Sequence, residues 1–199
     1  MLRVALTGGV ATGKSHVLEQ FRKRGVPCLD ADALAHGVTS AGTEATAAIS
    51  ARFGADVLAR DGSVDRAKLG PIVFADPAAR GDLEAIVHPA VYRAIASELR
   101  RLELSGNWPL AVADVPLLYE TGHDAEFDRV IVTVCSPSTQ LARLVERGMN
   151  ETEARQRSTA QWPTAQKASK ADFVIHTDGT FEDTDRQIEE IFRVLVGQA

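Results

Sequence analysis

The chain has 199 residues, of which 45% are hydrophobic and 25% are charged, values close to the average for globular proteins. This composition disfavours a disordered chain, a collagen and a coiled coil, and the length allows one substantial core with a small insert but not two ordinary domains. The formal net charge of -5 argues against a nucleic-acid-binding protein, because affinity for a duplex depends largely on clustered lysines and arginines.

The sequence contains no targeting segment that we can identify. The N-terminus leads directly into an apolar segment with none of the regions of a secretory signal, and no apolar run is long enough to span a bilayer. We therefore expect a cytoplasmic protein that binds no membrane. The two cysteines, Cys28 and Cys135, are too few for a disulfide framework, and we expect both to be reduced and packed at buried strand ends.

Short apolar segments alternate with helical patterns along the chain. Because none of these segments leads into a hairpin turn, the alternation predicts the α/β class, with a five-stranded parallel sheet and helices on both faces. Thr180 and Asp183 resemble a capping pair at the start of the last helix, which we expect to close one face of the sheet. The expected strands cover residues 4–7, 26–29, 110–115, 130–134 and 173–176.

The first strand is followed by Gly8-Gly9-Val10-Ala11-Thr12-Gly13-Lys14-Ser15, which matches the phosphate-binding P-loop at its usual place between a strand and a helix. Gly8 and Gly13 let the backbone turn tightly and direct N–H groups at phosphate oxygens. Lys14 is placed for the β- and γ-phosphates, and the Ser15 hydroxyl is placed for Mg²⁺. The sequence therefore predicts a nucleoside triphosphate site. Its expected contacts are Gly8, Gly9, Ala11, Thr12, Gly13, Lys14, Ser15 and His16.

The second expected strand ends in Asp30-Ala31-Asp32, which puts two carboxylates at the carboxyl edge of the sheet, beside the P-loop. Phosphoryl transfer needs a carboxylate that takes or orients the hydroxyl proton of the acceptor, and Asp32 is our candidate. The other acid, Asp30, caps the next helix or holds a metal-bound water. The alternative is that both acids belong only to the start of a helix.

The stretch from residue 31 to 107 has almost no strand pattern and predicts an inserted helical region, with the core formed by residues 1–30 and 108–199. The polar end of this insert is a candidate wall for a second ligand site beside the P-loop. His88 is a candidate substrate contact there, and the alternative is a packed or solvated side chain. Helices are expected at residues 45–53, 65–74 and 79–102, the last with an apolar stripe.

One acid lies near the end of the third expected strand and another follows it. Asp114 comes directly after the apolar run, an arrangement that steadies Mg²⁺ through a water molecule in many P-loop proteins. We therefore predict Ser15 and Asp114 as metal ligands. Glu120, further along, either contacts the substrate or begins the next helix.

Residues 143–170 reverse the charge of the chain, with six basic against three acidic residues, and a basic segment in an acidic chain indicates an anionic partner. Asn150 and Glu153 resemble a capping box, so we expect two helices joined by a turn, forming a flap that carries arginines over the phosphates. Arg147 is our candidate for contact with the transferring group. A solvated charged face is the competing explanation for Arg155 and Arg157.

These motifs together resemble the dephospho-CoA kinase family nearly from end to end. The resemblance implies an enzyme that uses ATP and Mg²⁺ to phosphorylate the ribose 3′-hydroxyl of dephospho-CoA, the last step of coenzyme A biosynthesis. It rests on six landmarks in order: Leu6-Thr7-Gly8-Gly9 through Gly13-Lys14-Ser15, Asp30-Ala31-Asp32, Ile86-Val87-His88-Pro89, Val115-Pro116-Leu117-Leu118-Tyr119-Glu120, Ser136-Pro137 with Thr139-Gln140-Leu141 and Arg147, and Ala171-Asp172-Phe173-Val174-Ile175.

The resemblance implies roles for particular residues. Asp32 is the implied catalytic base, the segment around His88 the implied CoA-side contact, and Arg147 the implied arginine of the lid. Together with the candidates from the residues themselves, we predict Asp32, Lys14 and Arg147 as catalytic and Asp32, His88 and Glu120 as substrate contacts. The insert is then the CoA-side region, and residues 137–170 are a lid. The implied partners are ATP and dephospho-CoA, with the chain acting as a monomer or a small homo-oligomer.

The chain departs from the family in its P-loop. Ala11 replaces a glycine that is usual in the family, and Thr12 and His16 replace serine and threonine. Ala11 loses access to some positive φ values, which implies a slightly altered loop. His16 either touches the α-phosphate or faces solvent.

Two other functions fit part of the pattern. A kinase of another small alcohol or nucleotide predicts a shorter insert than this one. A nucleotide-dependent switch protein is disfavoured, because the sequence has no Asn-Lys-x-Asp motif and Asp114-Val115-Pro116-Leu117 lacks the glycine of a switch.

Overall fold

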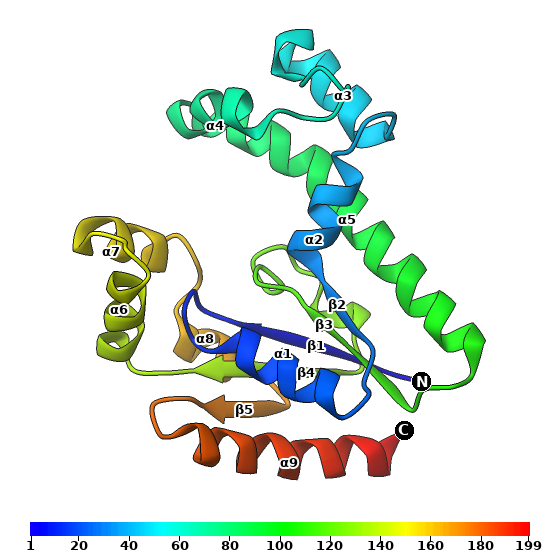
Figure 1. The fold of residues 1–199 in the computed structure, drawn as a ribbon, viewed down its shortest axis with the longest axis vertical. Coiled ribbons are helices and arrows are strands. Elements are labelled where there is room, and N and C mark those ends of the chain that lie inside the picture. The colour runs from blue at the N-terminus through cyan, green and yellow to red at the C-terminus, as the bar shows by residue number, and fades with distance from the viewer. The chain divides into compact units, whose positions relative to one another are not determined.

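The computed structural model describes residues 1–199, and its central feature is a sheet of five strands (Figure 1). The strands have the order β2-β3-β1-β4-β5, and every pairing between them is parallel. The predicted α/β class and parallel sheet are therefore confirmed. The strands are β1 Leu2–Gly8, β2 Cys28–Asp30, β3 Leu110–Asp114, β4 Arg129–Val134 and β5 Phe173–His176.

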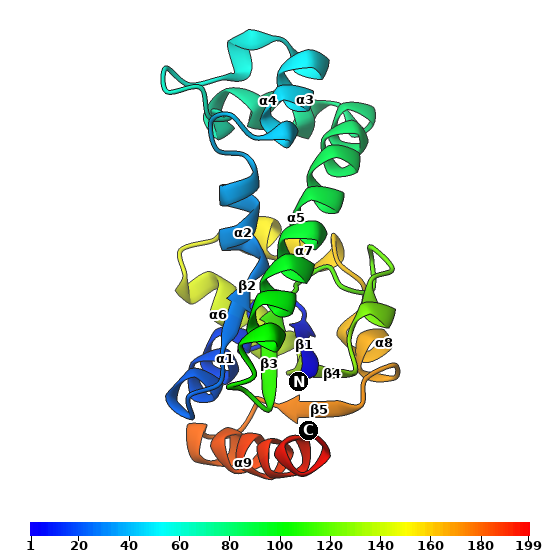
Figure 2. The same cartoon turned by 90° about the vertical axis from the view of Figure 1, so that its right-hand side faces the viewer.

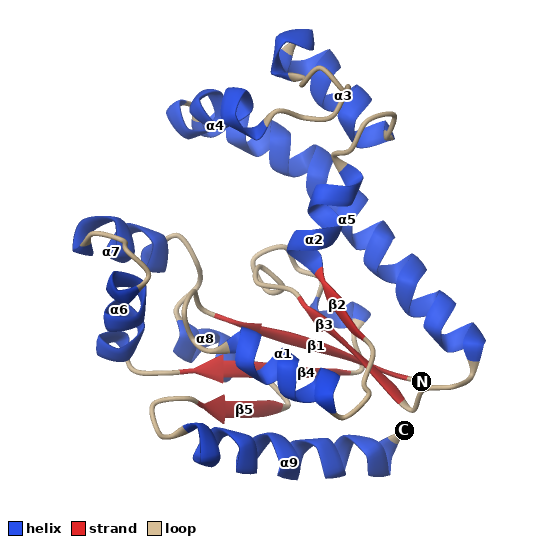
Figure 3. Cartoon of the chain, in the orientation of Figure 1, coloured by secondary structure: helices blue, strands red, loops and turns tan.

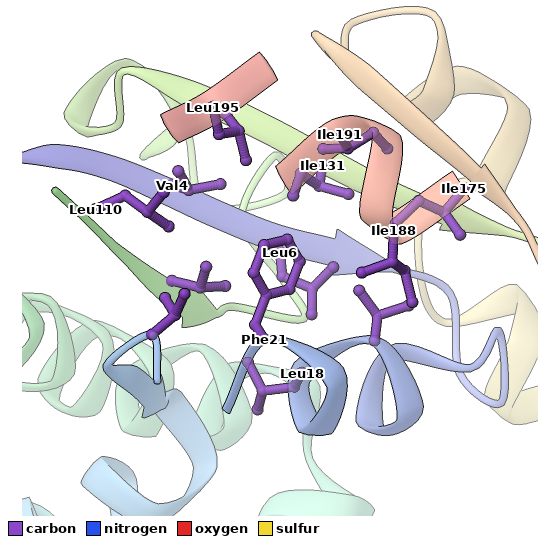
Figure 4. Packing of buried hydrophobic residues seen from close by; sticks show 13 residues of the cluster. Val4, Leu6, Leu18, Phe21, Leu110, Ile131, Ile175, Ile188, Ile191 and Leu195 are labelled. Atoms are coloured by element: carbon purple, nitrogen blue, oxygen red, sulfur yellow. The ribbon is translucent and has the colours of Figure 1, made fainter. Parts of the chain in front are cut away.

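One face of the sheet packs against two helices, α1 (Lys14–Lys23) and α9 (Phe181–Gln198). Phe21 of α1 and Ile188 of α9 are fully buried with Leu6 of β1, and Figure 4 shows the side chains of strands and helices meeting between them. Burial of each large apolar side chain contributes about 1.5–3 kcal/mol. The prediction that the last helix closes one face of the sheet is confirmed.

The opposite face of the sheet is covered in part by α8 (Thr164–Ala168), which contacts β1 and β4. Figure 2 shows α1 and α8 on opposite sides of the sheet. Helices therefore lie on both faces, as the alternation of strands and helices in the sequence predicts.

Two helices begin at the capping residues that the sequence predicts. Asn150 and Glu153 form a capping box at the start of α7 (Glu151–Thr159), and Thr180 and Asp183 form one at the start of α9. In each box the side chain of the first residue accepts from the backbone N–H of the second, and the side chain of the second accepts from the backbone N–H of the first. These two hydrogen bonds stabilise the first turn of the helix.

None of the helices combines the length and the apolar character that crossing a membrane requires.

The chain divides into two compact units, residues 1–30 with 101–199, and residues 31–100. The sheet belongs to the first unit. The second unit is entirely helical apart from its loops, and the three predicted helices of the insert are confirmed as α3, α4 and α5. The boundary lies within α5, since this helix continues past residue 100. The helices are α2 Ala31–Val38, α3 Glu44–Phe53, α4 Arg66–Ala75 and α5 Pro77–Ser105.

The second unit has a core of its own. Ile49, Val57 and Leu69 are buried there, and apolar residues of the first half of α5, such as Leu83 and Ile86, pack against them. The apolar stripe predicted for the longest helix therefore packs on its neighbours in this part of the helix, as the sequence indicates.

The cysteines are free and half-buried rather than fully buried as expected: Cys28 opens β2, and Cys135 follows β4. Burial raises the pKa of Cys28 from 9.0 to about 11 and also raises the pKa of Cys135. The folded state thus favours the protonated thiols. The contribution of Cys28 to stability is present below the unfolded pKa of 9.0 and is lost as the pH rises through the folded pKa of about 11.

We therefore expect both thiols to react slowly with iodoacetamide in the folded protein, because the thiolate is the nucleophile. In denaturant, alkylation should become faster at the same pH. The rates are measured by mass spectrometry with and without denaturant. Equal rates in the two states would contradict the protection of these thiols by burial.

Candidate active site

The carboxyl ends of the parallel strands lie at one edge of the sheet, where ligands of open parallel sheets bind (Figure 3). The strand register places Asp114, the last residue of β3, beside Leu6 of β1 and beside Asp30, the last residue of β2. The P-loop, residues 8–15, leaves β1 at the same edge. The structure therefore brings Asp30, Asp114 and the P-loop together, as the sequence predicts.

The P-loop turns through three residues with unusual backbone angles: φ is 154° at Gly8, 57° at Ala11 and 91° at Gly13. Ala11 is the only residue in the chain other than glycine with a positive φ. This left-handed conformation costs an L residue roughly 1–2 kcal/mol. The Ala11 side chain packs with Leu144 and Ala154, and this contact offsets part of the strain. Ala11 therefore adopts a turn that glycine adopts more easily.

Lys14 and Thr12 hold the loop in shape. The Lys14 Nζ donates to the Gly9 carbonyl at 3.2 Å, so the side chain folds back across the loop. The Thr12 side chain is buried, and its hydroxyl bonds to the Thr133 hydroxyl at 2.7 Å and to the Gly9 carbonyl at 2.8 Å. Ser15, at the start of α1, is exposed. The Thr12 hydroxyl thus fixes the loop to β4, while the Ser15 hydroxyl is accessible.

The structure leaves no room for a side chain at Gly8. A Cβ there would lie 2.7 Å from the backbone oxygen of Thr133 and 2.8 Å from the Thr12 hydroxyl. We expect Gly8→Ala to lower the free energy of unfolding by about 2 kcal/mol or more and to weaken nucleotide binding, because backbone has to shift. Urea unfolding and calorimetric titration with ATP measure the two effects.

Gly148→Ala is the matched control for this variant. Gly148 also has a positive φ, 88°, but nothing lies within 4 Å of its Cβ position. Gly148→Ala should lower the free energy of unfolding only by the cost of holding alanine at a positive φ, roughly 1 kcal/mol. If Gly8→Ala were no more harmful than Gly148→Ala, the close approach between β1 and β4 would not limit this position.

His16 is held by the last helix. Its Nε2 lies 2.7 Å from the Asp185 Oδ1, and its ring lies 4.8 Å from the ring of Phe181, measured between centroids. About a quarter of the side chain, 26%, is exposed. His16 therefore packs against α9 and does not simply face solvent. A contact with the α-phosphate stays a prediction.

Asp32 and His88 belong to the second unit. β2 ends at Asp30 and α2 begins at the next residue, so Asp32 lies in the first turn of α2. A carboxylate is favoured there by the partial positive charge of the helix N-terminus. Asp32 therefore belongs to the start of a helix, as the alternative has it, whereas Asp30 ends the strand. His88 lies half-buried within α5.

Glu120 lies in a turn and does not begin a helix, since the next helical segment is a 3₁₀ turn at Asp124–Glu126. Its Oε1 accepts the Trp162 N–H at 2.9 Å and lies 2.7 Å from the Nζ of Lys167, which is fully buried. Its Oε2 is buried without a hydrogen-bond partner. Glu120 therefore ties the segment after β3 to the chain around α8. A contact with substrate stays a prediction.

Two helices joined by a turn, α6 (Pro137–Glu146) and α7, form the segment for which the sequence predicts a flap, and its action as a flap stays a prediction. We call residues 137–159 the α6–α7 hairpin. Leu144 and Ala154 pack the two helices together and are both fully buried. The two helices predicted for this basic segment are confirmed.

The arginine of the hairpin that contacts the P-loop is Arg143. Its Nη1 donates to the Ala11 carbonyl at 3.3 Å and to the Thr177 hydroxyl at 3.0 Å. Arg147 caps the end of α6 and is exposed. Arg155 forms an exposed ion pair within α7, which agrees with a solvated face. The sequence showed the basic character of this segment but not which arginine reaches the loop.

The oxygen groups at the sheet edge suit Mg²⁺. The structure contains no group of three or more His, Cys, Asp or Glu side chains that would hold a metal ion alone. Ser15 and Asp114 supply a hydroxyl and a carboxylate, and Mg²⁺ in phosphate-transfer enzymes takes few protein ligands and completes its shell with water and phosphate oxygens. This donor set therefore fits Mg²⁺.

Known proteins resemble this chain along almost its whole length. The family model for dephospho-CoA kinase matches residues 2–183. The chain is 45% identical over 193 residues to a dephospho-CoA kinase of Geobacillus kaustophilus, covering 96% of each chain. It is 49% identical over 195 residues to a dephospho-CoA kinase of Anaeromyxobacter dehalogenans, covering 98% of this chain and 92% of the other.

Solved structures share the fold. TT1252 from Thermus thermophilus superposes with a TM-score of 0.81 at 31% identity, covering 98% of this chain and 97% of that one. The dephospho-CoA kinase from Campylobacter jejuni has a TM-score of 0.75 at 24% identity, covering 99% and 98%, and supports the fold alone. Because the family model and the sequence relatives both extend over nearly the entire length, the chain belongs to the dephospho-CoA kinase family.

Proposed function

We propose that the P-loop, Asp32 and Arg147 carry out the reaction of the family, transfer of the terminal phosphoryl group of ATP to the ribose 3′-hydroxyl of dephospho-CoA. Dephospho-CoA kinase activity, the last step of coenzyme A biosynthesis, follows from family membership. The assignment of residues is our proposal. The observation that carries it is the P-loop itself, with Lys14 folded across it and Asp114 beside it at the sheet edge.

The P-loop and α1 are suited to bind the polyphosphate of ATP. The N–H groups of the loop and the helix N-terminus favour anions, and Lys14 adds a full positive charge. Gly13 caps α1, and the first turn of the helix holds no acidic residue. No carboxylate in that turn therefore competes with phosphate for this positive end.

Asp32 acts in this proposal as the base for the 3′-hydroxyl. Its helix begins directly after β2, whose end lies at the sheet edge. A carboxylate there accepts the hydroxyl proton as the oxygen attacks phosphorus, and such proton transfer contributes typically 10²–10⁴-fold. Arg147 places its positive charge beside the transferring phosphoryl group and so stabilises the negative charge of that group. His88 and Glu120 are proposed contacts to dephospho-CoA.

Ser15 and Asp114 are the proposed ligands of Mg²⁺, which when bound neutralises charge on the phosphates. Residues 31–107 are proposed as the region that binds the CoA side of the acceptor, and residues 137–170 as a lid. The cytoplasmic location and the oligomeric state stay predictions from the sequence.

An assay of ADP release with several acceptors tests the proposal. With ATP and Mg²⁺, we expect turnover with dephospho-CoA and little with adenosine, shikimate or gluconate. Nuclear magnetic resonance of the product should show a phosphate on the 3′-oxygen of the ribose. Turnover with another acceptor and none with dephospho-CoA would instead support a kinase of another small alcohol.

A further inference from the structure

Both backbone polar groups of one P-loop residue are held by glutamine side chains. The Val10 N–H donates to the Oε1 of Gln161 at 2.8 Å, and the Val10 carbonyl accepts from the Nε2 of Gln140 at 2.7 Å. An amide side chain both donates and accepts, and it is neutral. The two glutamines therefore fix the backbone of Val10 without adding charge beside a loop that binds a polyanion.

The two glutamines lie at the two ends of the α6–α7 hairpin. Gln140 is in the first part of α6, and Gln161 follows the end of α7. Both ends of the hairpin are therefore joined to the same residue of the P-loop. We call Gln140 and Gln161 the Val10 clamp.

Apolar contacts accompany the clamp. Val10 and Ala11 belong to one cluster with residues of the hairpin, including Leu144. A Cβ at Gly9 would lie 2.9 Å from the Gln140 amide nitrogen and 2.9 Å from the Thr164 hydroxyl, so the hairpin and the chain at α8 fit closely over the loop. The hairpin therefore contacts the P-loop through apolar groups as well as through the two glutamines.

Further contacts hold the chain beside Gln161 in place. The next residue, Trp162, donates its backbone N–H to the Glu120 side chain, and Glu120 forms an ion pair with the buried Lys167. Lys167 also donates to the Pro116 carbonyl at 2.9 Å. Gln161 is thus fixed with respect to the segment after β3 as well as to the loop.

We propose that Gln140 and Gln161 are positioning residues for phosphoryl transfer. They fix Val10, and through it they set the P-loop relative to the hairpin that carries Arg147. The inference rests on the proposed function, in which Arg147 contacts the transferring group. Loss of either hydrogen bond loosens this relation and lowers kcat, because small misplacements of reacting groups are costly, while the affinity for ATP changes less.

Gln140→Met and Gln161→Met test the clamp, because methionine keeps the length of the side chain but loses the amide. We expect each variant to lower kcat about tenfold, the size expected for one lost hydrogen bond, with KM for ATP within about threefold of the parent value. The double variant should lose less than the product of the two, since both act on one residue. The control is Gln166→Met, on an exposed position of α8.

A second measurement, hydrogen exchange at Val10, does not depend on enzymatic activity. Exchange of the Val10 amide hydrogen, followed by nuclear magnetic resonance, should be faster in Gln161→Met than in the parent chain and in the control. Gln161→Glu keeps the acceptor and should restore the protection. Unchanged Val10 exchange in Gln161→Met, or unchanged kcat in both single variants, overturns the clamp.

The two proposals fail in different ways. If the parent chain shows no turnover that depends on dephospho-CoA, the proposed function fails, while the exchange experiment still decides whether the clamp holds Val10. If the parent chain is active and the variants match it in kcat and in exchange, only the clamp fails.

Discussion

Asp32→Asn is expected to bind ATP as tightly as the parent chain and to lose phosphoryl transfer by about 10²–10⁴-fold. Asparagine has nearly the shape of aspartate but cannot take a proton from the ribose hydroxyl. Because Asp32 lies outside the P-loop, in the first turn of α2, the substitution should leave the phosphate contacts in place. The expected loss is therefore in kcat, with little change in the dissociation constant for the nucleotide.

The measurement combines ADP release in the presence of dephospho-CoA with calorimetric titration of ATP. Asp30→Asn is the control, since Asp30 ends β2 two positions earlier and pairs in register with Asp114. We expect it to alter transfer less than Asp32→Asn. Full activity of Asp32→Asn, with the large loss in Asp30→Asn instead, would move the catalytic base to Asp30.

Lys167→Met is expected to destabilise the fold by about 3–5 kcal/mol, the usual cost of removing one partner from a buried ion pair. The Lys167 side chain is 0% exposed and the Glu120 side chain only 15%, so the substitution would leave the carboxylate without its partner and with little access to water. Its Oε2 already lacks a partner. The free energy of unfolding in urea measures the loss.

Two further variants define the cause. Glu120→Gln combined with Lys167→Met removes both charges and should recover part of the stability, because no uncompensated carboxylate remains. Lys170→Met is the control, since its Nζ lies outside the ion pair, 5.6 Å from the centroids of the Tyr119 and Trp162 rings. It should cost about 1 kcal/mol or less. Equal losses from the two single lysine variants would contradict a special role for burial.

The parts of the site that the sequence predicted are contiguous in the chain. The P-loop is one run of eight residues between a strand and a helix, and its pattern carries both its backbone shape and its chemistry. The capping boxes of α7 and α9 are local in the same sense, since each joins residues three positions apart. Local interactions of this kind can be predicted without knowledge of the fold.

The parts that the sequence did not reveal depend on contacts between distant segments. Lysine is rarely fully buried, so nothing marked Lys167 as the partner of Glu120. Gln161 contacts Val10 only because the chain returns to the P-loop after α7. Asp32 was predicted as a functional acid, but its place in a helix depends on β2 ending at Asp30, and such boundaries are poorly defined by composition.

The strand order has a consequence for synthesis of the protein on the ribosome. β1 emerges first, yet it is the central strand, and its neighbours are β3 and β4, with Leu2 opposite Leu110 and Val4 opposite Arg129. Until β3 has been synthesised, both hydrogen-bonding edges of this apolar strand lack their native partners, and one edge lacks its partner until β4 follows. The nascent chain therefore has to be kept from aggregating until β4 has been synthesised, and truncated products that end before residue 129 should be insoluble or captured by chaperones.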